Sequence, residues 1–126
     1  MGSKPDKQEA LADLVLEVLD DMKAIDVVRL DVRHLTTLMD DMIVASGRSD
    51  RHVRAIAQAL VVRCKEKGYP IASREGEEGG EWVLVDLMDV LVHIMLPKTR
   101  EFYELEKLWD ISVPAGNADR DRIRIR

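Results

Sequence analysis

The chain has 126 residues, of which 46% are hydrophobic and 34% are charged, and its formal net charge is −5. This length corresponds to about one domain, and no apolar run approaches the ~18 residues that a membrane-spanning helix needs. The composition therefore excludes a second full domain and an integral membrane protein. The N-terminal segment lacks the apolar stretch of a secretory signal, so we expect a cytoplasmic protein with no membrane partner.

The cysteine count and the net charge limit the kinds of metal, cofactor and partner that the chain can bind. A single cysteine, Cys64, excludes an internal disulfide, and three histidines with one cysteine match no spaced zinc-binding pattern. We therefore expect no metal and no other cofactor. Four arginines between residues 117 and 126 give a basic end to an otherwise acidic chain. An acidic surface repels phosphate backbones, so a basic protein matches it better than nucleic acid does.

The first third of the sequence predicts one helix and two strands. Apolar residues in 11–22 recur at helical spacing, as on one face of an amphipathic helix. The β-branched run at 27–32 predicts a first strand, and the apolar run at 42–45 predicts a second. Between them, residues 34–41 show no clear period and hold at most one helical turn.

The middle of the sequence predicts a second helix and a short strand. Ser49 or Asp50 is suited to accept hydrogen bonds from the first turn of this helix. Its apolar stripe runs through residues 53–64, and a glycine and a proline at 68–70 end it. Residues 71–74 then predict a third strand.

The last third predicts a hairpin and a final helix. A flexible acidic loop at 75–81 precedes the run 82–95, which is too long for one strand and predicts a hairpin with its turn at 88–89. Pro97 opens a last helix, whose apolar side extends to residue 109. Since a tight hairpin forces antiparallel pairing, we predict an α+β fold with a mixed sheet covered mainly by helices.

These elements divide the chain into three parts. We expect a disordered segment at residues 1–9, one domain at 10–113 and a flexible arginine-rich tail at 114–126. Alternating arginine and isoleucine in the tail would suit contact with RNA. A solvated, disordered tail without RNA contact is nevertheless the expectation for such a charge run.

The two faces of the predicted hairpin differ in character. One face is uniformly β-branched, as in a core packed under helices, and consists of Val83, Val85, Val90, Val92 and Ile94. The other face consists of Trp82, Leu84, Asp86, Leu91, His93 and Met95. Such a mixture of large apolar and polar groups is typical of an exposed recognition surface. The alternative is that a further helix or a second copy of the chain covers this face and makes Trp82 part of the core.

Residue types that carry nucleophilic catalysis occur without a specific arrangement. Ser49 and His52 lie close together at a predicted helix start, where capping accounts for the serine and solvent exposure for the histidine. Cys64 falls on an apolar helical stripe, which indicates a core residue and not a reactive thiol. The glycine-rich loop at 76–80 lacks the lysine of a phosphate-binding loop and is flanked by glutamates.

The alternative function is a metal-dependent nucleotidyltransferase. That chemistry needs paired carboxylates on one strand face to hold two metal ions against a triphosphate. Asp86 with Asp89, and Asp40 with Asp41, have spacings that place the two carboxylates on different faces of a strand. We therefore keep this enzyme as the second hypothesis, and a scaffold that only homodimerises as the third.

The order of several short motifs resembles the ribosomal silencing factor family, also called the Iojap family. Along the chain they are DMIV at 41–44, SGRSDRHV at 46–53, EG at 75–76, WVLVD at 82–86, VH at 92–93 and TREFYELEKLW at 99–109. The resemblance covers roughly residues 10–109. It implies an α+β domain related to the nucleotidyltransferase fold but without the catalytic carboxylates, and so no enzyme activity.

The resemblance also implies a function and a contact surface. Members of the family bind the large ribosomal subunit through the basic ribosomal protein bacterial L-fourteen, which blocks joining of the small subunit and represses translation. The positions here that match the family's contact surface are Trp82, Asp86, Leu87, Asp89 and His93. The family usually has glycine where this chain has Met88, so we expect a wider turn here. Homodimerisation through the same face would compete with ribosome binding.

Overall fold

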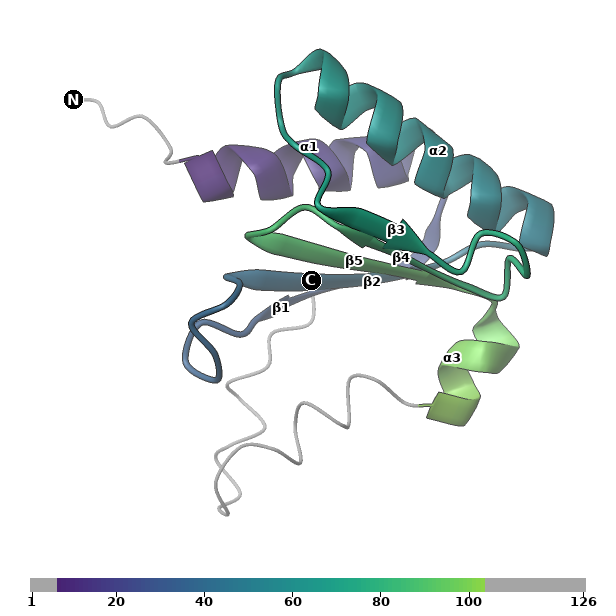
Figure 1. Ribbon diagram of the computed structural model, residues 1–126. Helices are drawn as coiled ribbons and strands as arrows, with labels where there is room; N and C mark the ends of the chain where they lie inside the picture. The colour runs from purple at the N-terminus through teal and green to yellow at the C-terminus, as the bar shows by residue number, and fades with distance from the viewer. Residues whose placement is uncertain (1–6, 104–126) are drawn as a thin grey trace, which may run out of the picture.

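The computed structural model in Figure 1 describes residues 7–103, which form a sheet with helices packed on it. Helices α1 (Lys7–Asp21) and α2 (Asp50–Glu66) cover one face of the sheet together. The short helix α3 (Pro97–Tyr103) lies on the other side, directly after the last strand. Both long helices are those predicted from the apolar periodicity.

Within residues 7–103, the sheet has five strands in the order β1-β2-β5-β4-β3. They are β1 (Ile25–Asp31), β2 (Asp41–Ser46), β3 (Ser73–Glu75), β4 (Trp82–Asp86) and β5 (Val90–Met95). Strands β2 and β5 pair in parallel, and all other neighbours pair antiparallel. The mixed sheet confirms the predicted α+β class. Helix α2 lies in the long connection that a parallel pair requires.

The face of the sheet beneath α1 and α2 carries the main hydrophobic core. The predicted β-branched face of the hairpin lies there, and its members are fully buried: Val83, Val85, Val90, Val92 and Ile94. The stripe of α2 packs against them, including Ile56, Leu60 and Cys64. Burying one side chain of this size contributes ~1.5–3 kcal/mol. The hairpin is therefore fixed to the helices, with its other face turned away from them.

A second, smaller hydrophobic cluster lies on that opposite face. Its buried members are Val28, Leu30, Val32, Met42, Val44 and Met95. Leu35 and Met39, from the loop between β1 and β2, pack against it from one side, and Trp82 and Leu91 pack against it from the hairpin. Residues 34–40 thus form an irregular loop, with a hydrogen-bonded turn where the Leu35 and Thr36 N–H groups donate to the Val32 carbonyl oxygen, and residue 41 already belongs to β2.

The start of α2 corrects one expectation. Ser49 caps the helix, since its hydroxyl oxygen accepts from the His52 backbone N–H at 3.1 Å. His52 was expected to face solvent, but its Nδ1 accepts from the Arg48 backbone N–H at 2.9 Å. Its Nε2 then donates to the Met22 carbonyl oxygen at 2.8 Å. This carbonyl group lies directly after the end of α1, where carbonyl groups have no donor within the helix. His52 therefore joins the end of α1 to the start of α2.

Three sequence expectations concern regions outside residues 7–103. These are the segment 1–9 up to residue 6, the tail at 114–126, and the last helix after Tyr103, whereas residues 7–9, expected to be disordered, belong to α1. The limits of the domain therefore stay predictions. Within the described residues, no helix has the length and apolar character needed to cross a membrane.

Candidate interaction surface

The register of the hairpin agrees with the sequence prediction. Trp82 pairs with Met95, Leu84 with His93, and Asp86 with Leu91. Because paired residues of neighbouring strands share a face, these six side chains lie on the face of the sheet away from α1 and α2. We call the part of this face over β3, β4 and β5 the open face.

Trp82 and His93 interact directly on the open face. The Trp82 indole Nε1–H donates to His93 Nδ1 at 2.9 Å, and the two ring centroids lie 5.8 Å apart at a tilt of 48°. An imidazole nitrogen that accepts a hydrogen bond carries no proton, so this contact selects the neutral ring with its proton on Nε2. The bond fixes the orientation of the indole, whose side chain is half-buried.

The open face is less exposed than the sequence predicted. His93 is 8% exposed, Met95 is fully buried, and Trp82 packs against the second hydrophobic cluster. Met95 and most of His93 are therefore covered within the chain itself, without a second copy. Trp82, Leu84, Asp86 and Leu91 are half-buried, so the accessible strip follows β4 and the turn end of β5.

A hollow of about 280 Å³ opens on this strip. It is lined by Glu75, Gly76, Trp82, Leu84 and His93. Gly76 has φ of +89°, and a Cβ atom at this position would collide with the Trp82 carbonyl oxygen, so only glycine lets the loop approach β4 this closely. Glu75 was not expected at the contact surface from the sequence, and Leu84 was expected there only as a member of the mixed face of the hairpin.

The turn of the hairpin contradicts the expectation of a wider loop. Leu87 N–H donates to the Val90 carbonyl oxygen at 2.9 Å, which closes a tight turn around Met88 and Asp89. Met88 has φ of +76°, and the Asp89 N–H donates to the Leu87 carbonyl oxygen at 3.0 Å. This is a γ-turn of the strained, positive-φ kind. Met88 therefore adopts the backbone conformation that glycine would adopt at lower cost, and its side chain is 57% exposed.

Of the candidate residues at the turn, Asp86 and Asp89 lie at the surface and Leu87 does not. Asp86 Oδ1 accepts from the Met88 N–H at 2.8 Å, which stabilises the turn, and the Asp89 side chain is exposed. Leu87 is only 2% exposed and belongs to the main core. Its expected side-chain contact with a partner is therefore corrected to a packing role beneath the turn.

The five candidate residues form two groups at opposite ends of the hairpin. Trp82 and His93 share one end, and Asp86, Leu87 and Asp89 share the other. Asp86 lies four positions after Trp82 along β4, which amounts to about 13 Å at ~3.3 Å per residue. A partner must therefore cover most of the length of β4 to contact both groups.

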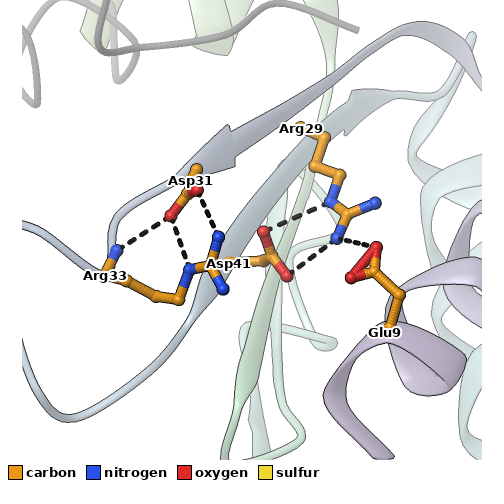
Figure 2. A network of polar contacts seen from close by, with 5 residues as sticks. All are labelled: Glu9, Arg29, Asp31, Arg33 and Asp41. Carbon is orange, nitrogen blue, oxygen red and sulfur yellow. Dashed lines mark hydrogen bonds and ion pairs between the residues drawn. The ribbon is translucent and has the colours of Figure 1, made fainter. Parts of the chain in front are cut away.

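A separate polar network occupies the start of β2, on the face toward α1 (Figure 2). Arg29 donates from Nε and Nη2 to the two carboxylate oxygens of Asp41, each at 3.2 Å, and also contacts Glu9 at 3.2 Å. Asp41 is 5% exposed, so this fork neutralises a buried charge. Next to it, Arg33 donates to both carboxylate oxygens of Asp31 and holds the pKa of Asp31 down at about 2.

This network bears on the nucleotidyltransferase hypothesis. Asp31 and Asp41 are paired residues of β1 and β2, so the structure brings together two carboxylates that the sequence analysis had not paired. Each carboxylate is already bound by an arginine, which repels a metal cation from the same oxygens. Among the residues that the structure describes, no cluster of three histidine, cysteine or acidic side chains is arranged to hold a metal ion.

Comparison with known proteins identifies the family. The sequence profile described as "Ribosomal silencing factor during starvation" matches residues 5–125. The chain belongs to the ribosomal silencing factor family. The ribosomal silencing factor of Chromobacterium violaceum is 46% identical over 107 residues, which are 85% of this chain and 88% of that protein. The family resemblance seen in the sequence motifs is thereby confirmed.

A solved structure and a more distant relative extend this comparison. The crystal structure of a protein from Chromobacterium violaceum superposes with a TM-score of 0.80 at 46% identity, covering 82% of this chain and 87% of that one. A mouse protein named mitochondrial assembly of ribosomal large subunit protein 1 is 34% identical over 102 residues, which are 79% of this chain and 45% of the mouse protein. A region similar to this chain thus makes up about half of the longer mouse protein.

Proposed function

We propose that this chain binds the large ribosomal subunit through the basic ribosomal protein bacterial L-fourteen and blocks joining of the small subunit, which represses translation in the cytoplasm. Membership of the ribosomal silencing factor family supports the regulatory role. The name of the mouse relative refers to the large ribosomal subunit, which supports that subunit as the target. The finer mechanism is a hypothesis that rests on the open face.

The observation that carries this proposal is the position of Trp82. Its half-buried indole is oriented by the hydrogen bond to His93 on the accessible strip of β4. Aromatic side chains held in this way supply large contact areas at small entropic cost, and they are enriched among the residues that dominate binding energy. Asp86 and Asp89 add negative charge at the other end of the strip, which suits a basic protein.

Sedimentation of ribosomal subunits tests the proposed function. Purified large and small subunits are mixed with the protein at a magnesium concentration that allows their association, and the mixture is separated on a sucrose gradient. We expect the protein to migrate with the large subunit and the peak of joined subunits to be lost. A protein that stays at the top of the gradient, with the joined peak unchanged, contradicts the proposal.

Substitution of Trp82 tests whether the open face is the contact surface. Trp82→Ala is expected to weaken binding of the large subunit by about 2 kcal/mol, roughly thirtyfold in affinity, as for an interface hot spot. The matched control is Val62→Ala, which shortens an apolar side chain that is 40% exposed on α2, away from the open face. Circular dichroism establishes that both variants fold. A folded Trp82→Ala variant with unchanged affinity would exclude the open face.

A further inference from the structure

The hollow beside Trp82 is lined by acidic, aliphatic and aromatic side chains. Glu75, Leu84 and His93 are paired in register across β3, β4 and β5, so their side chains form one row on the open face. Trp82 and Gly76 complete the lining. A volume of about 280 Å³ is below the ~300–1,000 Å³ of pockets for drug-sized ligands, so a hollow of this size suits one side chain or a small group.

The described lining of the hollow carries negative charge from Glu75, and the neighbouring cation in the sequence, Arg74, lies on the other face of the sheet. Arg74 precedes Glu75 in β3 and pairs with Val85, which is buried in the main core. Its guanidinium donates to the Glu77 carboxylate and, at 2.9 Å, to the side-chain oxygen of Gln58 on α2. The positive charge of Arg74 therefore lies on the side of the sheet that faces the helices. Among the described residues that line the hollow, Glu75 therefore brings the only formally charged side chain.

An aromatic ring and a carboxylate around one hollow match a guanidinium group. A cation within ~6 Å of an indole face is attracted by the quadrupole of the ring, and a carboxylate at the rim adds two hydrogen-bond acceptors. Arginine combines a planar group that stacks on aromatic rings with a fork of donors, whereas the lysine ammonium is a compact, strongly hydrated charge. The lining of this hollow therefore favours arginine.

We infer that the hollow formed by Glu75, Leu84, Trp82 and His93 is a receptor for one arginine side chain of the basic ribosomal partner. This inference rests on the proposed function and adds to it a specific point of recognition. The guanidinium stacks on the Trp82 ring while Glu75 accepts its hydrogen bonds. The His93 contact has a positioning role, because it holds the indole edge and leaves the orientation of the ring fixed.

Charge-neutralising variants of two nearby glutamates test this receptor on the ribosome. Glu75→Gln removes the charge of the hollow with little change in shape, and Glu78→Gln removes the same charge from an exposed position of the neighbouring loop. We expect Glu75→Gln to weaken binding of the large subunit about tenfold, which equals ~1.4 kcal/mol, and Glu78→Gln to change it less than about twofold. Equal affinities of the two variants would overturn the inference.

A second measurement examines the free protein and does not require the ribosome. The amide of N-acetyl-arginine is titrated into isotope-labelled protein, and the indole N–H resonance of Trp82 is followed by NMR after assignment with Trp109→Phe. We expect a saturable shift in the wild-type protein. The isosteric but uncharged amide of N-acetyl-citrulline should give no such shift, and neither ligand should shift the resonance in Glu75→Gln. Equal shifts with both ligands would overturn the inference.

The two measurements separate the inference from the proposed function. If the wild-type protein fails to migrate with the large subunit but shows the arginine-specific shift, the proposed function is wrong and the receptor remains. If the protein binds the subunit but Glu75→Gln behaves as Glu78→Gln does, the proposed function stands and the receptor is wrong. The amide spectrum of each variant shows directly that it is folded.

Discussion

Single side chains in this protein show how burial changes chemistry. Cys64 lies on the apolar stripe of α2 and is fully buried, as its position in the sequence predicted. Burial raises the pKa of the Cys64 thiol from 9.0 to about 11. Because the thiolate is the reactive form, this change makes it about a hundredfold scarcer near neutral pH than for a free thiol.

We therefore predict that Cys64 resists alkylation in the folded protein. At pH 7.5, iodoacetamide should modify it at least about a hundredfold more slowly than it modifies the same protein unfolded in urea, because both the scarcity of thiolate and the lack of access slow the reaction. Mass spectrometry over time measures both rates. Rapid modification of protein whose circular dichroism is native would show that Cys64 is accessible and that its assignment to the core is wrong.

Other residues show where sequence reasoning succeeds and fails at this scale. Alternation along β4 places Val83, Val85 and Leu87 on the same side of the sheet. The burial of Leu87 could therefore have been predicted from the sequence, although the family resemblance implied a contact with the partner. The hydrogen bonds of the His52 ring could not be predicted from the sequence. Its acceptor at Met22 lies 30 positions away, and no local spacing reports a contact that depends on how two helices pack.

At the scale of elements, the hairpin was the most predictable part of the site. Alternation with period two and a two-residue connection fix one register, and the observed pairs agree with it. The contribution of β3 could not be predicted in the same way. This strand has three residues, too few for an alternation of apolar and polar residues to fix its register against β4. The sequence therefore did not indicate that Glu75 lies opposite Leu84.

The turn of the hairpin leads to a prediction about stability. Met88 has a positive φ that costs a non-glycine residue about 1–3 kcal/mol. Met88→Gly should remove this strain and, after the larger chain entropy of unfolded glycine is subtracted, raise the free energy of unfolding by about 1 kcal/mol. For a domain of this size, that corresponds to an increase in Tm of about 4–8 °C in a thermal melt.

Met88→Ala is the matched control for this turn. It removes the exposed side chain but keeps the Cβ atom, so the backbone strain remains and no gain in stability is expected. If both variants raise Tm equally, the gain comes from loss of the side chain and not from the backbone. If Met88→Gly lowers Tm, the positive φ of Met88 does not cost stability and the prediction is wrong.

At the scale of the whole molecule, the helices and the hairpin differ in how their acidic side chains are neutralised. The chain has a net charge of −5, with its basic end in residues 117–126. On the helical layer several acidic side chains are paired with arginine, such as Glu17 and Asp21 with Arg63. On the hairpin, Asp89 is exposed and lies at the rim of the proposed contact surface. A rim charge acts on the approach of a partner more than on the final affinity.

The exposed charge of Asp89 is therefore expected to affect the rate of association with the partner. Asp89→Lys should slow association with isolated bacterial L-fourteen about three- to tenfold at low ionic strength and should weaken the dependence of the rate on salt. Its backbone carbonyl oxygen, which accepts from Asp40 and Asp41, is unaffected by the substitution. The control is Asp20→Lys on α1, which changes the net charge equally but lies on the covered side of the sheet. Because charges farther apart than the Debye length of ~10 Å at 0.1 M salt are largely screened, it should have little effect.

Stopped-flow mixing at two salt concentrations measures these rates, and a third variant identifies the chemical class of the target. Removal of residues 117–126 takes away positive charge, which has the wrong sign to attract a basic protein, so association with bacterial L-fourteen should be nearly unchanged. If association with the whole subunit instead depends on this arginine-rich segment and is indifferent to Asp89, the first contact is made to ribosomal RNA. The acidic rim of the hairpin would then have no part in the encounter.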